Sequence, residues 1–171
     1  SIPIIYNKSW AFRNGKAVTD ADAAVTGTQN LSVTVNATNQ TNPIFSGIDF
    51  SGSNDVRIFK SATANDDGSA GGNKAIDVLN GLDFSNANAG TLATVPEVTD
   101  AAKSILINHI PAGTQLGEAA TDVLGVDAIT FAFSYGAQIF GDGANISPEA
   151  LTIWRNAAYI LAGLDVPTTL V

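Results

Sequence analysis

The sequence has no cysteine and no methionine among its 171 residues. Without cysteine the chain can form no disulfide, offers no thiolate to a metal and has no cysteine nucleophile. The lack of both sulfur residues suits an oxidising exterior, where both residues are easily damaged. Ser1 in place of Met fits signal-peptide cleavage or removal of an initiator methionine, and the first alternative predicts an exported protein.

Charged side chains are also scarce. They make up 14% of the residues, against about 25% in typical soluble domains, whereas hydrophobic residues make up 45%. This composition predicts that other copies of the chain, or another partner, cover part of its surface. A merely uncharged surface is the alternative.

Two further classes of partner are disfavoured. The net charge is −8, and the eight lysines and arginines are scattered singly, whereas nucleic-acid binding needs clustered cations. No apolar run in the sequence approaches the ~18 residues that a membrane span needs. We therefore expect neither nucleic-acid binding nor a transmembrane segment.

The hydrophobic pattern predicts a mainly β chain. Apolar residues alternate with a period of two in residues 31–36 and 129–135, and the pattern also predicts an extended segment at 105–110. It further predicts a hairpin of residues 44–50 with 56–59 and a short helix at residues 74–79. The length fits one core. We predict a single α+β domain over residues 1–171, with an antiparallel β-sandwich or jelly-roll-like sheet, short helices and one long C-terminal helix.

The C-terminal helix has the clearest signals. Ser147 is a good N-cap, Pro148 suits the first helical position, Glu149 places negative charge in the first turn, and Gly163 can end the helix. Apolar residues occur nearly all round this helix. We therefore expect it to be buried on two sides, within the domain or between subunits.

One short motif occurs twice. Gly-Ile-Asp-Phe-Ser at residues 47–51 recurs as Gly-Leu-Asp-Phe-Ser at residues 81–85. Two copies are too few for a repeat protein. The motif instead predicts a turn that the aspartate caps and the phenylalanine anchors in the core.

The N-terminal segment, residues 1–12, is too apolar for a free tail. Its period of two predicts a strand, and Pro3 favours an edge strand or an extended arm. Such an arm can add a strand to a neighbour's open sheet edge, with pairing inside its own chain as the alternative. The predicted assembly interface consists of Ile2, Ile4, Tyr6, Trp10, Phe12 and Trp154.

Catalytic motifs are missing. His109 is the only histidine, it lies in an apolar strand-like stretch, and no Gly-x-Ser-x-Gly elbow occurs. Pairs of carboxylates close in sequence fit solvated loops better than a hydrolase site. We predict that the protein is not an enzyme and assign no catalytic residue, with a carboxylate hydrolase as a remote alternative.

Calcium is the one cofactor with sequence support. Asp66 and Asp67 precede a glycine-rich stretch, and Asp142 and Asn145 flank Gly143, so both loops offer the oxygen ligands that calcium uses. Neither loop matches an EF-hand. An ordinary solvated turn is the favoured alternative.

Five Asn-x-Ser/Thr triplets are candidates for N-glycosylation and would give the protein a surface glycan. They begin at Asn7, Asn30, Asn36, Asn39 and Asn145. A polar strand face without glycans is the alternative.

A third of the chain resembles a known family. Gly90-Thr91-Leu92, the stretch Ile105 to Gly113 and Asp142 to Ile146 are together similar to the second half of a fasciclin-type adhesion domain. The family's upstream Thr-Val-Phe-Ala-Pro-Thr-like stretch has no counterpart, and the C-terminal helix departs from the family's ending. The resemblance implies an adhesion role as an alternative.

These patterns together predict a structural subunit outside the cell, either secreted or on a cell or virion surface. It would assemble into a homo-oligomer or polymer by N-terminal strand donation, with calcium support. The alternative is a secreted adhesion or carbohydrate-binding module that uses Tyr6, Trp10 or Tyr135 as a stacking platform.

Overall fold

Two compact units make up the chain in the computed structural model. The structure describes residues 2–6, 24–27, 30–60, 76–80, 91–95, 104–105, 107–115, 121, 123–131 and 145–171. Unit 1 comprises residues 1–27 and 77–133, and unit 2 comprises residues 28–76 and 134–171. Strands and one long helix together confirm a mixed α+β protein. The single-domain organisation stays a prediction.

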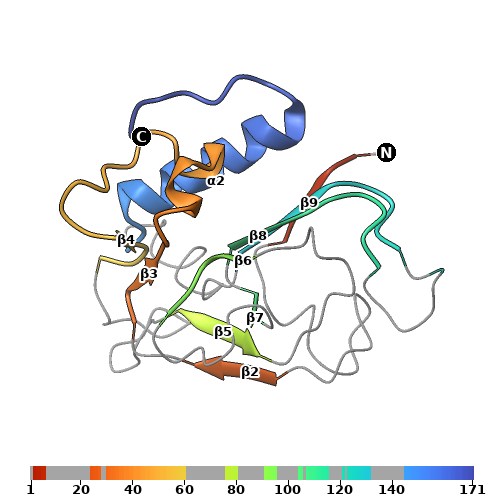
Figure 1. Ribbon diagram of the computed structural model, residues 1–171, viewed down its shortest axis with the longest axis horizontal. Coiled ribbons are helices and arrows are strands. Elements are labelled where there is room, and N and C mark those ends of the chain that lie inside the picture. Colours follow the sequence, from red (N-terminus) through yellow and green to blue (C-terminus); the bar gives the residue numbers. More distant parts are fainter. Residues whose placement is uncertain are drawn as a thin grey trace. The chain divides into compact units, whose positions relative to one another are not determined.

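The described residues of unit 1 form two sheets (Figure 1). A four-stranded sheet has the order β1-β9-β8-β6, and a three-stranded sheet has the order β2-β5-β7. All described pairs are antiparallel except β1 with β9, which is parallel. The strands are β1 (Ile4–Tyr6), β2 (Ala24–Gly27), β5 (Asp77–Asn80), β6 (Thr91–Ala93), β7 (Ser104–Ile105), β8 (Ile107–Ile110) and β9 (Ala128–Phe131).

The strand β9 is buried on both faces. All four of its residues are buried, and on the neighbouring β8 only His109 is partly exposed. The sequence predicted half-buried alternation in this region. A parallel partner is typical of strands that are covered on both faces, which agrees with the pairing of β9 with β1.

Unit 2 combines a two-stranded ribbon with helices. The strands β3 (Ser32–Thr34) and β4 (Asp55–Arg57) pair antiparallel, so that Val33 lies opposite Val56. The 3-10 helices η2 (Asn39–Thr41) and η3 (Pro43–Phe45) lie between these strands in sequence, and the helix α2 (Pro148–Ala162) follows near the C-terminus (Figure 1).

The predicted hairpin of residues 44–50 with 56–59 is wrong. Asn42 accepts a hydrogen bond from the backbone of Ile44 at 3.0 Å, and Pro43 follows as the first residue of η3. This cap starts a helical turn where the sequence predicted a strand. The strand β4 pairs instead with β3.

The predicted helix at residues 74–79 is also wrong. Residues 77–80 form β5, which pairs with β2 on one side and with β7 on the other. Pairing with strands distant in sequence overrides the local helix signal here.

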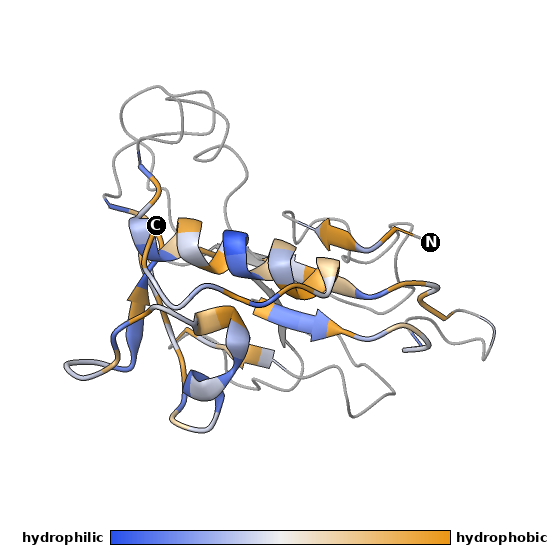
Figure 2. Cartoon of the chain, turned by 90° about the horizontal axis from the view of Figure 1, so that it is seen from above, coloured by the Kyte–Doolittle hydropathy of each residue, from blue (hydrophilic) through white to orange (hydrophobic). Residues whose placement is uncertain are grey.

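Both predicted ends of α2 are confirmed. Ser147 Oγ accepts from the backbone N of Ala150 at 2.9 Å, and Gly163 ends the helix in the left-handed conformation at φ 67°. Only one side of α2 is buried: Ile153 is fully buried, whereas Leu151 is 40% exposed. The helix accordingly shows both hydrophobic and hydrophilic colours in Figure 2. Burial on a second side stays a prediction about assembly.

Side chains of α2 form hydrogen bonds with the backbone of the C-terminal segment, residues 164–171. Arg155 Nη2 donates to the backbone oxygens of Pro167 at 3.4 Å and Thr169 at 2.7 Å. Thr152 Oγ1 accepts from the backbone N of Val171 at 2.9 Å. We call residues 164–171 the C-terminal strap.

The Gly-Ile-Asp-Phe-Ser motif forms the predicted turn in its first copy. Asp49 Oδ1 accepts from the backbone N of Ser51 at 2.8 Å, and the rings of Phe45 and Phe50 meet edge to face with centroids 6.1 Å apart. Hydrogen bonds from Ser51 hold the pKa of Asp49 below its ordinary value. The second copy, residues 81–85, lies outside the described residues.

Candidate assembly surface

The outer strand β1 is held by a short ladder. Ile4, Ile5 and Tyr6 lie opposite Ala128, Ile129 and Thr130 of β9, and the backbone N of Ile4 donates to the backbone oxygen of Asp127 at 3.1 Å. In the described four-stranded sheet β1 has a strand on one side only (Figure 1). The edge position that Pro3 predicted is confirmed.

The apolar side chains of this strand remain partly outside. Ile2 is 84% exposed and Ile4 is 38% exposed, while Ile5 and Tyr6 are half-buried. The strand next to the N label in Figure 2 carries the colour of hydrophobic residues. In contrast, Ala128, Ile129 and Phe131 of β9 have no exposed surface. The buried strand β9 is thus paired with an outer strand, β1, whose apolar side chains are partly exposed to solvent.

The predicted interface residues fall in different places. Ile2, Ile4 and Tyr6 lie together at β1, whereas Trp154 lies on α2 in unit 2, where its side chain is half-buried. Trp10 and Phe12 lie outside the described residues.

Further exposed apolar residues were not predicted from the sequence. Among the residues that the structure describes, they are Val123 in unit 1 and Leu151, Leu164, Leu170 and Val171 in unit 2. The apolar end of the sequence, Leu170 and Val171, was the available signal. Thr152 of α2 holds this end through its hydrogen bond with the backbone N of Val171, and the side chains of Leu170 and Val171 remain partly in solvent.

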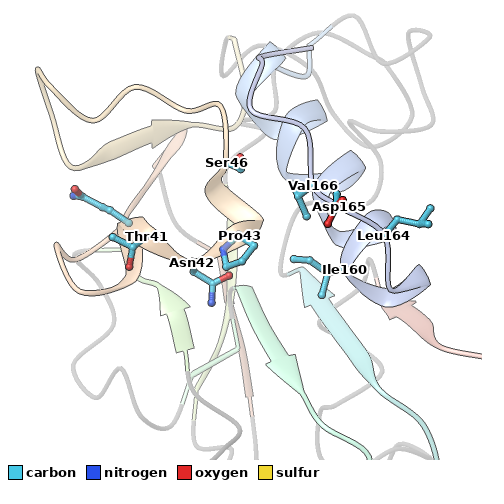
Figure 3. A pocket seen from close by; sticks show the side chains of 9 residues that line it. Thr41, Asn42, Pro43, Ser46, Ile160, Leu164, Asp165 and Val166 are labelled. Atoms are coloured by element: carbon cyan, nitrogen blue, oxygen red, sulfur yellow. The ribbon is translucent and has the colours of Figure 1, made fainter.

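A groove lies in unit 2 between the C-terminal end of α2 and the helices η2 and η3. Its volume is about 490 Å³. Figure 3 shows Asn42 and Pro43 on one wall and Ile160, Leu164 and Val166 on the other.

Three polar side chains of this groove already make hydrogen bonds within the protein. Gln40 Nε2 donates to the backbone oxygen of Val35 and to Asn54 Oδ1, Asn42 caps η3, and Ser46 Oγ donates to the backbone of the strap. A sugar would have to replace these bonds, which weakens the case for a carbohydrate site.

The one histidine lies beside a carboxylate. His109 Nε2 is 3.9 Å from Asp127 Oδ2, beyond hydrogen-bond distance. The other carboxylate oxygen of Asp127 accepts from the backbone N of Ala112 at 2.8 Å. Asp127 therefore holds the turn after β8, and no hydrogen-bond partner among the described residues reaches His109 Nε2.

Three of the four predicted calcium ligands lie outside the described residues. Asp66, Asp67 and Asp142 lie outside the described residues, and Asn145 is half-buried with its backbone oxygen accepting from the backbone N of Lys60 at 2.8 Å. Within the described ranges no three His, Cys, Asp or Glu side chains gather as a metal site would require. Calcium binding stays a prediction.

Four of the five glycosylation candidates can be placed. Asn36 is exposed, whereas Asn30, Asn39 and Asn145 are half-buried. Asn7 lies outside the described residues.

No family model, curated protein or solved structure matches this chain. In the part of the chain that the structure describes, no helix is both long and apolar enough to cross a membrane.

Proposed function

We propose that this protein is a structural subunit of an extracellular assembly, secreted or on a cell or virion surface. Copies join by strand exchange, in which residues 4–6 of one copy pair with β9 of the next. The observation that carries this proposal is the short outer strand β1, paired over three residues with the fully buried strand β9.

The acceptor is the edge of β9 that β1 covers. If β1 leaves, the backbone groups of Ala128 to Thr130 lose their ladder partners, and the buried side chain of Ile129 loses its neighbour Ile5. Unpaired edges and exposed apolar area are both unfavourable. A strand must therefore occupy this edge, and the equivalent strand of a neighbour fits it equally well.

The donor is the N-terminal strand itself. Exchange of an identical segment reproduces the same hydrogen bonds between copies, so its free-energy change is small. Main-chain pairing supplies the affinity of added strands, and side chains on alternate positions supply specificity. Ile2, which is 84% exposed, extends beyond the ladder and becomes buried if a neighbour packs against it.

A sandwich arrangement of unit 1 belongs to the same proposal. The strand β7 of the three-stranded sheet ends at Ile105, and β8 of the four-stranded sheet begins at Ile107, so these two strands of different sheets are neighbours in the sequence. Passage of neighbouring segments between sheets is typical of β-sandwiches and jelly rolls. Burial of β9 on both faces supports a second layer.

The competing functions predict other behaviour. An adhesion or carbohydrate-binding module needs β1 for its own fold and does not polymerise through it. An enzyme loses activity when one acid is changed to its amide. Our proposal is non-enzymatic and keeps calcium as a supporting ligand, to be tested with a chelator.

Removal of residues 1–6 tests the proposal. The full chain is expected to form large species by size-exclusion chromatography and regular particles by electron microscopy. The truncated chain, which lacks the donor strand, is expected to remain folded in unit 2 by circular dichroism and to form no polymer. An excess of a synthetic peptide of residues 1–6 should shorten the polymers of the full chain, because it occupies the acceptor edge.

Gly52→Ala is the control, since Gly52 is exposed and takes no part in the pairing of β1 with β9, and this variant should still polymerise. Polymers from the truncated chain would show that assembly uses another surface. A full chain that stays monomeric at every concentration, with calcium and with chelator, would rule out self-assembly.

A further inference from the structure

Asn36 presents a glycosylation triplet in an exposed turn. Asn36, Ala37 and Thr38 follow the strand β3 after Val35, and all three are exposed. Asn36 Oδ1 accepts from the backbone N of Asn39 at 3.0 Å. Because only the oxygen of an amide side chain can accept a hydrogen bond, this contact fixes the orientation of the amide group. The nitrogen Nδ2 is not used in this contact.

The triplet at Asn145 is sequestered in the fold. Its third residue, Ser147, is 2% exposed. Ser147 Oγ donates to the backbone oxygen of Arg57 at 2.6 Å and accepts from the backbone N of Ala150 at 2.9 Å. Access to this hydroxyl requires the start of α2 to open.

The triplets at Asn30 and Asn39 are also held by structure. Ser32, the third residue after Asn30, lies in β3 opposite Arg57. Asn39 begins η2 and is half-buried, and Thr41 Oγ1 donates to the backbone oxygen of Thr38 at 3.4 Å. In both triplets the asparagine is half-buried, whereas all three residues of the Asn36 triplet are exposed. A modifying enzyme therefore needs more local opening at Asn30 and Asn39 than at Asn36.

We propose that Asn36 is the site of an N-linked glycan, and that it is the preferred acceptor among the four triplets that the structure describes. The inference rests on the exported location in the proposed function, because glycan transfer to Asn-x-Ser/Thr occurs on exported chains.

The donor of this reaction is a lipid-linked glycosyl diphosphate. Asn36 Nδ2 attacks the anomeric carbon of the sugar and forms the N–C bond. The bond between that carbon and the diphosphate oxygen breaks, and the lipid diphosphate leaves with the electron pair. One amide proton passes to a base of the transferase. Because the sugar is attached to Nδ2, Oδ1 continues to accept from Asn39 N.

Glycan transfer to the folded protein tests the proposal directly. An Asn7→Gln chain, purified from a host without N-glycosylation, is incubated with a single-subunit oligosaccharyltransferase and a lipid-linked oligosaccharide diphosphate. Peptide mass spectrometry then follows each triplet. We expect Asn36 to be modified at least about tenfold faster than Asn30, Asn39 or Asn145, because those sites require local opening.

Two controls separate the fold from the sequence. The same chain, unfolded before the reaction, should lose the preference for Asn36. Thr38→Ala removes the hydroxyl of the triplet but keeps Asn36 and its hydrogen bond, and it should abolish transfer at Asn36, whereas Thr38→Ser should retain transfer.

Equal rates at all four triplets of the folded chain would overturn the proposal, as would transfer at Asn36 that survives Thr38→Ala. The assay needs neither export nor assembly. A failed strand-exchange test would therefore leave this result standing, and a failed transfer test would leave strand exchange untouched.

Discussion

Replacing Asn156 by Ala is expected to lower the free energy of unfolding by about 3 to 4 kcal/mol. Asn156 is fully buried on α2. Its Nδ2 donates to the backbone oxygens of Ile44 at 3.0 Å and Ser46 at 2.8 Å, and its Oδ1 accepts from the guanidinium of Arg155. The truncation leaves two carbonyl groups without a donor next to a cavity, which is a costly combination.

Asn156→Asp separates hydrogen bonding from packing. The carboxylate has nearly the same volume but faces the two carbonyl oxygens with an acceptor, so this variant should also be strongly destabilised. Thermal unfolding followed by circular dichroism should show a decrease of roughly 10 °C for Asn156→Ala in a chain of this length. Ala158→Gln, at an exposed site on the same helix, should change stability by less than about 0.5 kcal/mol. An Asn156→Ala protein as stable as this control would contradict the role given to Asn156.

Replacing Gly47 by Ala is expected to detach the C-terminal strap and to lower stability by about 2 to 4 kcal/mol. Gly47 has φ 87°, a conformation that side chains disfavour, and an added Cβ would lie 2.7 Å from the backbone carbon and oxygen of Thr169. The strap cannot move away without loss of its bonds to Arg155 and Thr152.

Chemical denaturation measures this effect. Gly52→Ala is the control, since Gly52 has no atom within 4 Å of the added Cβ, and it should be neutral or slightly stabilising. In a chain that ends before Thr169 the steric part of the Gly47→Ala effect should disappear, and only the backbone part should remain. An equal loss in both chains would show that Thr169 is not the cause.

Elements with local signals were predicted well from the sequence. The helix α2 begins and ends where Ser147, Pro148 and Gly163 indicated, because capping depends on residues within one turn of each end. The turn at Gly47 and Asp49 was predicted for the same reason. Such features need no partner distant in sequence.

Elements that depend on partners distant in sequence were not predicted from the sequence. The start of η3 repeats the signal of α2, with Asn42 before Pro43 as Ser147 stands before Pro148, yet the apolar run that follows predicted a strand. The strand β5 forms because β2 and β7 flank it, and no pattern within residues 74–80 contains that information.

The candidate surface was predicted in part. The apolar period of residues 2–6 and Pro3 indicated an edge strand, and β1 lies at the edge of the four-stranded sheet that the structure describes. Its parallel partner β9 is more than a hundred residues away in sequence, so the pairing could not be derived from local patterns. The exposure of Asn36 relative to the other triplets likewise follows from hydrogen bonds that only the fold defines.

Disulfide trapping between copies tests the central claim most directly, because the chain has no cysteine of its own. Ile4 lies opposite Ala128 in the register of β1 and β9, so Ile4→Cys in one variant and Ala128→Cys in another place one thiol on the donor and one on the acceptor. The two variants are unfolded together, allowed to assemble and then oxidised. Strand exchange predicts covalent dimers of the two variants, and few dimers when Ile4→Cys is mixed with the exposed control Val123→Cys. If the mixture gives no more dimers than the control, while a double variant carrying both cysteines closes a disulfide within single chains, β1 pairs only with its own chain and the account is contradicted.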